Sequence, residues 1–254
     1  MAWDPKIYLA FGEERTRPAR ELLAQIDLTH PAHVVDLGCG PGNSTALLAA
    51  RWPDAELEGI DSSAEMLEEA RRSKFEANWL QADIAQWNPS RTYDVVYSNA
   101  TFQWIADHAR LLPAIAKHLA PEGVFAFQVP RNFEEPCHTL IREVARNGPW
   151  RDKLKDVRDW WNVREPEEYF DILEPHARAL DLWETTYQQV LEGEDAVYRW
   201  MMGTGLRPFA NALEGAEREA FLAEYRTRVG QAYPRRESGV TLYPFRRLFC
   251  VMRS

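Results

Sequence analysis

The chain has 254 residues, 45% of them hydrophobic and 27% charged, which is typical of a globular protein with a full core. The chain has a net charge of −9, whereas nucleic-acid binders typically carry an excess of positive charge, so we expect no nucleic-acid partner. No apolar run approaches the roughly 20 residues that span a bilayer, no signal-peptide pattern opens the chain, and three scattered cysteines favour neither disulfides nor a metal site. We therefore expect a cytoplasmic protein without a metal or a membrane partner.

Residues 1–30 predict an arm that precedes the main domain. The arm contains Tyr8 and, ten residues later, Pro18, which is placed to open a helix. Leu22 and Ile26 have the spacing of residues on one face of that helix. We expect this arm to act as a lid over a ligand site.

A glycine loop follows the first predicted strand. The strand ends at Asp36, and Gly38, Gly40 and Gly42 form a turn that lets the backbone approach a ligand closely. A dinucleotide fingerprint would need a third glycine where Asn43 stands, which argues against a dehydrogenase. The Asp-x-Gly-x-Gly-x-Gly spacing resembles motif I of the class I methyltransferases that depend on S-adenosylmethionine (SAM).

The stretch after the loop predicts a helix over 44–51 and a strand over 55–60. Asp61 ends that strand, about 20 residues past the loop, where a carboxylate would hold a ribose diol. The alternative is that Asp61 only caps the next helix. Ser62 and Glu65 have the spacing of a capping box for a helix that carries Met66.

A third strand is predicted over 78–81, followed by Asp83 and Ile84. In methyltransferases of this class an acid here meets the adenine amino group, and an apolar neighbour covers the ring. The alternative for Asp83 is a solvated loop aspartate.

The fourth predicted strand, 93–100, ends in the small polar turn of Asn99 and Ala100. Trp104 follows and would lie beside a sulfonium, where cation–π attraction contributes about 0.5 to 2 kcal/mol. The alternative is that Trp104 packs in the core.

The ends of these strands share one chemical feature. Asp36, Asp61, Asp83 and Asn99 all follow apolar strands that alternate with helices. Strands of this kind form an open parallel sheet, and ligands bind outside its carboxyl ends. We expect all four side chains at that edge.

Three further strands complete the sheet. They are predicted over 124–129, 177–189 and 248–252, and the last two are separated by far more chain than a hairpin needs. The intervening chain has helical stretches and predicts a cap over the ligand edge. We thus expect one α/β domain, a Rossmann-like seven-stranded sheet with an N-terminal helical arm and a helical cap between strands six and seven. The expected boundaries are 1–30 for the arm, 31–190 and 241–254 for the core, and about 191–240 for the cap.

Segments outside the cofactor motifs resemble one family, trans-aconitate 2-methyltransferase, along nearly the whole chain. The segments that carry the resemblance are 8–23, the glycine loop, 99–104 with Asp107 and His108, 128–130, 135–138, 204–208 and 247–249. Two positions depart from the family pattern. Arg131 replaces an acid, and Arg246 replaces a proline, so both add positive charge near the expected acceptor site.

The resemblance implies a carboxyl O-methyltransferase that uses SAM, releases S-adenosylhomocysteine and takes a small polycarboxylic acid as its partner. Because a carboxylate is already a nucleophile at neutral pH, the reaction needs no general base, and holding the reactants in line does most of the work. The residues implied to bind the cofactor are Asp36, Gly38, Gly40, Asp61, Ser62, Met66, Asp83, Ile84, Asn99 and Ala100.

The resemblance also implies a site for the acid. The implied catalytic residues are Trp104, His108 and Arg207, and the implied substrate-binding residues are Tyr8, Arg17, Gln103, Arg131, Arg207 and Arg247. Arg17 could instead serve the methionine carboxylate of SAM, and each arginine could be a solvated or helix-capping charge. Two other functions stay open: a methyltransferase for a different small acid or natural product, and a non-catalytic SAM-binding module.

Overall fold

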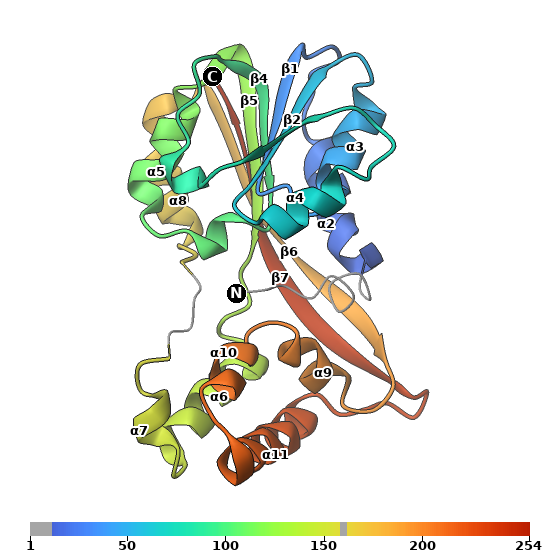
Figure 1. Cartoon of the computed structure of the whole chain (residues 1–254), viewed down its shortest axis with the longest axis vertical. Helices are drawn as coiled ribbons and strands as arrows, with labels where there is room; N and C mark the ends of the chain where they lie inside the picture. Colours follow the sequence, from blue (N-terminus) through green and yellow to red (C-terminus); the bar gives the residue numbers. More distant parts are fainter. Residues whose placement is uncertain (1–11, 158–161) are drawn as a thin grey trace. The chain divides into compact units, whose positions relative to one another are not determined.

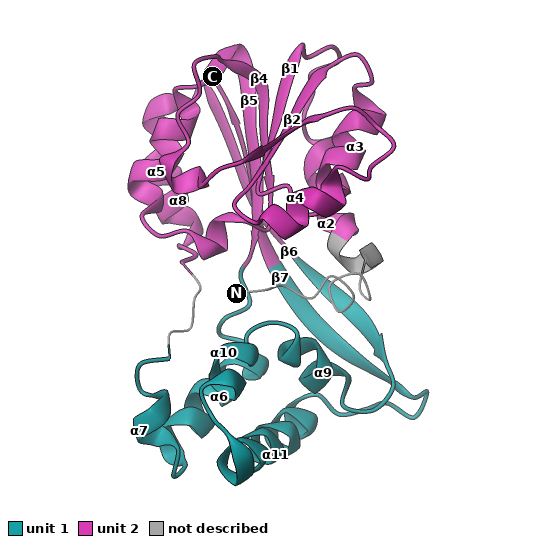
Figure 2. Cartoon of the chain, in the orientation of Figure 1, with its two compact units in different colours: residues 1–11, 131–161, 186–246 teal, residues 12–130, 162–185, 247–254 magenta. Residues whose placement is uncertain are grey.

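The computed structural model describes residues 12–157 and 162–254, with side chains from Thr16 onward (Figure 1). The described chain forms two compact units, which are coloured separately in Figure 2. The sheet unit comprises residues 12–130, 162–185 and 247–254, and the helical unit comprises residues 131–157 and 186–246.

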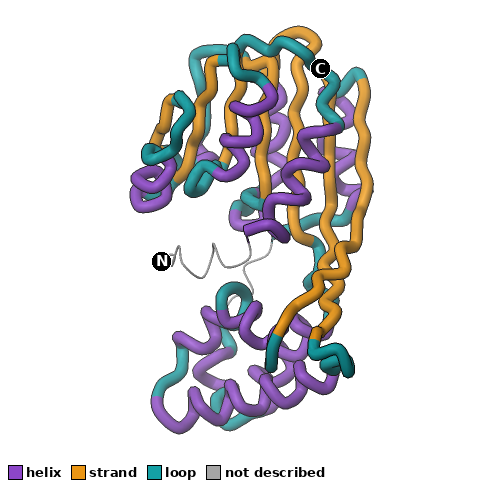
Figure 3. The backbone as a smooth tube through the Cα atoms, turned by 90° about the vertical axis from the view of Figure 1, so that its right-hand side faces the viewer, coloured by secondary structure: helices purple, strands orange, loops and turns teal. Residues whose placement is uncertain are grey.

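The seven-stranded sheet predicted from the sequence is confirmed, with strand order β3-β2-β1-β4-β5-β7-β6. Strands β1 to β5 pair in parallel, and β7 pairs antiparallel with β5. The strands are β1 His33–Leu37, β2 Glu56–Asp61, β3 Asn78–Gln81, β4 Tyr93–Asn99, β5 Leu119–Pro130, β6 Ala179–Glu192 and β7 Val240–Arg253. In Figure 3 the strands appear in orange, and β6 and β7 continue past the sheet unit, since their residues 186–192 and 240–246 belong to the helical unit.

The central strands are apolar because both faces of the sheet are covered. Val34, Val35 and Val96 are fully buried, as expected for the interior of a parallel sheet. Helices α5 and α8 lie on one face, and α2, α3 and α4 lie on the other (Figure 1). These helices are α2 Gly12–Ala24, α3 Asn43–Arg51, α4 Ala64–Ala70, α5 His108–Ala116 and α8 Pro166–Leu173; the 3-10 turns are η1 Ile84–Gln86, η2 Phe102–Trp104 and η3 Glu174–His176.

Helix α2 corrects one prediction about the arm. Pro18 does not open the helix but lies inside it, since α2 begins at Gly12. Proline removes one backbone donor from a helix, and the burial of Ala19 and Leu22 offsets that loss. The Tyr97 hydroxyl also donates to the carbonyl oxygen of Ala19 at 2.7 Å, which joins α2 to β4. Residues 12–24 are thus part of the sheet unit.

The helical unit contains more of the chain than the predicted cap. Helices α9 Ala196–Met202, α10 Arg207–Asn211 and α11 Gly215–Ala232 fall within the expected insertion. However, α6 Pro136–Asn147 and α7 Arg151–Leu154, which we assigned to the core, also belong to this unit. The reason is packing, because Ile141 and Val144 of α6 are buried in one hydrophobic cluster with residues of α9 and α11.

The three cysteines are free and buried. No helix in the described part of the chain is long and apolar enough to cross a membrane.

Candidate functional site

The glycine loop joins β1 to α3 with its three glycines in the left-handed region of backbone conformation. Gly38 has φ 77°, Gly40 has φ 54° and Gly42 has φ 90°. A Cβ on Gly38 would lie 2.1 Å from the Thr101 hydroxyl oxygen, whereas a Cβ on Gly40 would meet no heavy atom within 4 Å. The loop is therefore packed tightly at Gly38 and open at Gly40, where a ligand can approach the backbone.

Asp61 holds this loop from the end of β2. Its Oδ2 accepts a hydrogen bond from the Gly40 amide at 2.9 Å, and its Oδ1 accepts one from the Ser63 amide at 2.9 Å. A carboxylate has about four acceptor positions, so two remain for hydroxyl donors such as those of a ribose. Asp61 therefore orders the loop and retains the capacity that we expected of it.

The start of α4 differs from the capping box predicted at Ser62. The helix cap is Ser63, whose hydroxyl oxygen accepts from the Met66 amide at 3.2 Å. The Ser63 hydroxyl donates to Glu65, so the acid does not reach back to the cap backbone in the reciprocal manner of a capping box. Ser62 is exposed, and Met66 is buried beneath the first turn of α4.

Asp83 and Ile84 follow β3 in the predicted order. Asp83 is exposed, and its Oδ1 accepts from the Ala85 amide at 2.9 Å and so caps the η1 turn. Ile84 is buried beside it. The aspartate is thus a loop residue with one oxygen engaged in the cap.

Asp36 is fully buried at the end of β1. Its Oδ2 accepts hydrogen bonds from the hydroxyls of Ser44 and Thr45, each at 2.7 Å. Its Oδ1 is buried and has no hydrogen-bond partner among the described residues. Burial outweighs the two hydrogen bonds and raises the pKa of Asp36 from its ordinary 3.8 to about 6. A buried acid with one unsatisfied oxygen next to an open loop fits a cationic ligand, as SAM is.

Asn99 ends β4 and is joined through Gln128 of β5 to Arg247 of β7. The Gln128 side-chain amide donates to Asn99 Oδ1, and its Oε1 accepts from Arg247 Nη1 at 3.0 Å. Ala100, the next residue, has φ 56°, and its amide donates to the Gln128 carbonyl oxygen at 3.0 Å. The structure thus brings the predicted Asn99, Ala100 and Arg247 together at the carboxyl edge of the sheet.

The η2 turn carries Gln103 and Trp104. Gln103 Nε2 donates to the Ala100 carbonyl oxygen at 2.6 Å, while its buried Oε1 finds no partner within the described chain. Trp104 is 42% exposed, which excludes the alternative that it is a core residue. An exposed indole a few residues after the end of β4 agrees with a role in contacting a ligand.

His108 does not match the role that we expected for it. The ring is buried, Nε2 is 2.8 Å from the Phe102 carbonyl oxygen, and Nδ1 is 2.9 Å from the Tyr169 hydroxyl. Because a carbonyl only accepts, Nε2 carries the proton and Nδ1 accepts from Tyr169. Burial also lowers the pKa of His108, which favours the neutral ring. With both nitrogens engaged, His108 anchors the η2 turn to α8 and has no atom left to orient an accepting carboxylate.

The remaining predicted substrate-binding residues lie in different parts of the chain. Arg17, on α2, has a side chain that is 66% exposed and forms an ion pair with Glu21 at 2.7 Å. Arg131 and Arg207 are half-buried residues of the helical unit, and Arg207 is the first residue of α10. Tyr8 lies outside the described residues.

Two sets of residues at the site were missed. Ser44 and Thr45 supply the hydroxyls that bind Asp36, and their position in the first turn of α3, directly after the glycine loop, was an available signal. Gln128 was noticed only as part of a family segment, although a polar residue inside the apolar run of β5 could have marked it.

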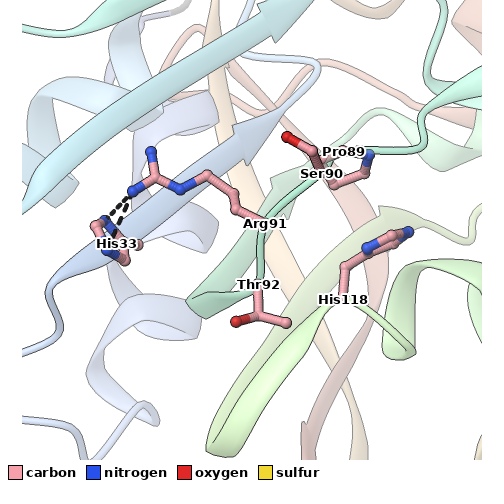
Figure 4. A pocket seen from close by; sticks show the side chains of 6 residues that line it. All are labelled: His33, Pro89, Ser90, Arg91, Thr92 and His118. Carbon is pink, nitrogen blue, oxygen red and sulfur yellow. Dashed lines mark hydrogen bonds between the residues drawn. The ribbon is translucent and has the colours of Figure 1, made fainter.

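A separate hollow of about 620 Å³ lies at the opposite edge of the sheet, where β1, β4 and β5 begin (Figure 4). Arg91 on its wall contacts the His33 ring at 2.7 Å and pairs with Glu56 at 2.6 Å. In parallel sheets ligands bind at the other end of the strands, so we do not connect this hollow with the candidate site. The residues that line it are His33, Pro89, Ser90, Arg91, Thr92 and His118.

Comparison with known proteins gives consistent results. A family model described as "Methyltransferase domain" matches residues 34–123. Proteins named trans-aconitate 2-methyltransferase are 50% identical in Azoarcus sp. (strain BH72), over 98% of this chain and 98% of that protein, and 47% identical in Rhodopseudomonas palustris (strain BisB18), with the same coverage. The one from Yersinia pseudotuberculosis serotype O:1b (strain IP 31758) is 45% identical over 98% of this chain and 97% of its own.

Solved structures support the fold. The YcgJ protein from Bacillus subtilis matches with a TM-score of 0.60 and 14% identity, over 94% of this chain and 98% of that one. The plantazolicin methyltransferase BpumL, solved with a triazolic desmethylPZN analog and S-adenosylhomocysteine (SAH), matches with a TM-score of 0.53 and 17% identity, over 98% and 90% of the two chains. At these identities the likeness shows the fold alone.

Proposed function

The chain belongs to the trans-aconitate 2-methyltransferase family, and from this premise we propose that it transfers the methyl group of SAM to a carboxylate oxygen of trans-aconitate and releases SAH. The observation that carries the proposal is 50% identity across 98% of both chains. This similarity extends beyond the methyltransferase match at 34–123 and includes the helical unit, so it concerns more than cofactor binding.

We assign the cofactor to the carboxyl edge of the sheet unit. SAM supplies an activated methyl group on a sulfonium. The open backbone at Gly40 would admit its amino-acid part, the free oxygen of Asp36 would take its ammonium, and Asp61 would bind the ribose hydroxyls. The exposed Asp83 and the buried Ile84 would bind the adenine from two sides.

The acceptor needs no general base, because its carboxylate is ionised at neutral pH. The residues that would act on it are therefore those that bind and orient an anion. Arg247 is 5% exposed and lies next to the cofactor edge through Gln128. Arg131, Arg207, Arg17 and Tyr8 remain our candidates for the other carboxylates, and Gln103 for the orientation of the reacting one. His108 we reassign to positioning of the η2 turn that carries Gln103 and Trp104.

Trp104 is the candidate for contact with the sulfonium. Its exposure leaves an indole surface available, and a cation over an indole gains about 0.5 to 2 kcal/mol. Because the sulfonium loses its charge when the methyl group leaves, this contact would mainly favour binding of SAM over SAH.

The proposal is tested with isotope-labelled SAM and trans-aconitate. We expect a labelled monomethyl ester, identified by mass spectrometry, and stoichiometric SAH. A panel of other dicarboxylic and tricarboxylic acids measures the specificity. Efficient transfer to another acid with none to trans-aconitate would replace the substrate assignment, and SAM binding without turnover on any acid would support the non-catalytic alternative.

A further inference from the structure

A buried chain of polar side chains crosses three strands at the carboxyl edge of the sheet. It runs from Arg247 on β7, through Gln128 on β5, to Asn99 on β4. Gln128 is 1% exposed and pairs in register with Asn99, so the two side chains meet across neighbouring parallel strands. Arg247 reaches the same amide from β7, two residues along the strand from Phe249, the residue that pairs with Gln128.

The hydrogen-bond donors and acceptors of these three side chains can be arranged in only one way. A guanidinium has five N–H donors and no acceptor, so the Gln128 oxygen must face Arg247. The Gln128 amide nitrogen then faces Asn99, and Asn99 must present its oxygen to it. The Nδ2 of Asn99 is consequently turned away from Gln128, and no described residue accepts a hydrogen bond from it. Asn99 is only half-buried, so these two N–H groups can reach a ligand.

We infer that Gln128 is a positioning residue that fixes the polarity of the Asn99 side chain, so that Asn99 offers hydrogen-bond donors to a ligand carboxylate. This inference rests on the proposed function, which places two carboxylate ligands at this edge, the accepting acid and the methionine end of SAM. A donor stabilises a carboxylate, whereas an oxygen in the same place would repel it. Arg247 thereby acts on the ligand through two neutral side chains, in addition to any direct contact.

Replacement of Gln128 by glutamate tests whether Gln128 sets the orientation of the Asn99 amide, because glutamate has almost the same shape as glutamine. The introduced carboxylate would still accept from Arg247, but it could no longer donate to Asn99. Asn99 would then turn its amide by half a rotation, donate to that carboxylate and present its oxygen to the ligand. We expect Gln128→Glu to raise either the KM for trans-aconitate or the Kd of SAH about tenfold, with a small change in kcat, since one hydrogen bond to a charged group is lost. The constant that rises identifies which carboxylate Asn99 binds.

The control is the same substitution in an Asn99→Ala background. If Gln128 acts through Asn99, Gln128→Glu should change neither constant by more than about twofold there, because the intermediate is missing. Equal effects in both backgrounds, or no effect in either, would overturn the inference. Gln128→Leu is the second variant, in case the glutamate does not fold. It leaves the Asn99 amide free to turn, so its effect should be smaller than that of glutamate and should also vanish in the Asn99→Ala background.

A readout that is independent of turnover separates this inference from the proposed function. The side-chain amide of Asn99, assigned in NMR spectra by its loss in Asn99→Ala, should exchange its hydrogens more slowly in Gln128→Glu, because it becomes bonded to the carboxylate. Unchanged exchange would overturn the inference even in an active enzyme. Slower exchange in a protein that does not methylate trans-aconitate would support it and reject only the proposed substrate.

Discussion

Replacement of Asp36 by asparagine should make the stability of the protein less sensitive to a rise in pH from about 5 to about 7. The carboxyl is fully buried, and burial raises its pKa from 3.8 to about 6. A raised pKa means that the folded state holds the proton more tightly than the unfolded state does. The contribution of Asp36 to stability is therefore complete below pH 3.8, and it is lost as the pH rises through 6.

The magnitude follows from the same pKa. A shift of this size corresponds to about 3 kcal/mol of unfolding free energy lost by pH 7, of which about 1 kcal/mol is lost between pH 5 and pH 7. Asparagine cannot ionise, so the variant lacks this loss. Its nitrogen would take the place of the Oδ1 that has no partner among the described residues, and this adds a penalty that does not depend on pH. The difference between the two proteins should therefore be measured as a function of pH.

The assay is urea unfolding of the ligand-free proteins at pH 5, 6 and 7. The unfolding free energy of Asp36→Asn minus that of the wild type should rise by about 1 kcal/mol across this range, or about 2 to 4 °C in Tm. The matched control is Asp54→Asn, an exposed aspartate ahead of β2, which should show no comparable trend. A constant difference for Asp36 from pH 5 to pH 7 would refute the reasoning. SAM affinity should fall in Asp36→Asn, since the proposed partner of its ammonium has lost its charge.

Three further predictions concern the ligand edge. Gly38→Ala should lower the unfolding free energy in denaturant melts by about 2 kcal/mol or more, because its Cβ would meet Thr101. Gly40→Ala should lower the unfolding free energy by only about 1 to 2 kcal/mol, from backbone strain, and should instead weaken SAM binding in calorimetry. A larger loss of stability in Gly40→Ala than in Gly38→Ala would contradict the open space at Gly40. Trp104→Ala should leave the Tm within a few degrees but raise the Kd of SAM more than that of SAH, and a loss of several kcal/mol of stability would show that the indole is a packing residue. Arg207→Ala should raise the KM for trans-aconitate at least tenfold with SAM affinity intact, and unchanged kinetics would remove Arg207 from the site.

The local features of the site were readable from the sequence because each depends on a few neighbouring residues. The positive φ values at Gly38 and Gly40 are accessible to glycine at little steric cost, so the loop is visible in the letters alone. Asp61 and Asp83 could be placed because the carboxyl ends of parallel strands share one edge of the sheet. The same reasoning placed Asn99 at the end of β4.

Other features were outside the reach of local patterns. Ser63 caps α4 in place of Ser62. The cap is the residue whose backbone is extended just before the first helical residue, and a sequence pattern locates that residue only to within one or two positions. Helix α6 joins the helical unit because of what its apolar face contacts far along the chain. His108 is enclosed because its ring bonds to Tyr169 of α8 and to Phe102 of η2, and a contact with a residue 61 positions away cannot be inferred from local spacing.

The sequence by itself determined the type of sheet, the donor of the methyl group and the family, because strand periodicity, glycine conformation and residue identity are properties of the chain. Only the tertiary structure decided the ionisation of Asp36 and the orientation of Asn99. The first depends on how completely the carboxyl is removed from water, and the second on Arg247, 148 positions later in the sequence, which reaches Asn99 through Gln128. Burial and hydrogen-bond polarity are collective properties of distant residues, and they exist only once the sheet has formed.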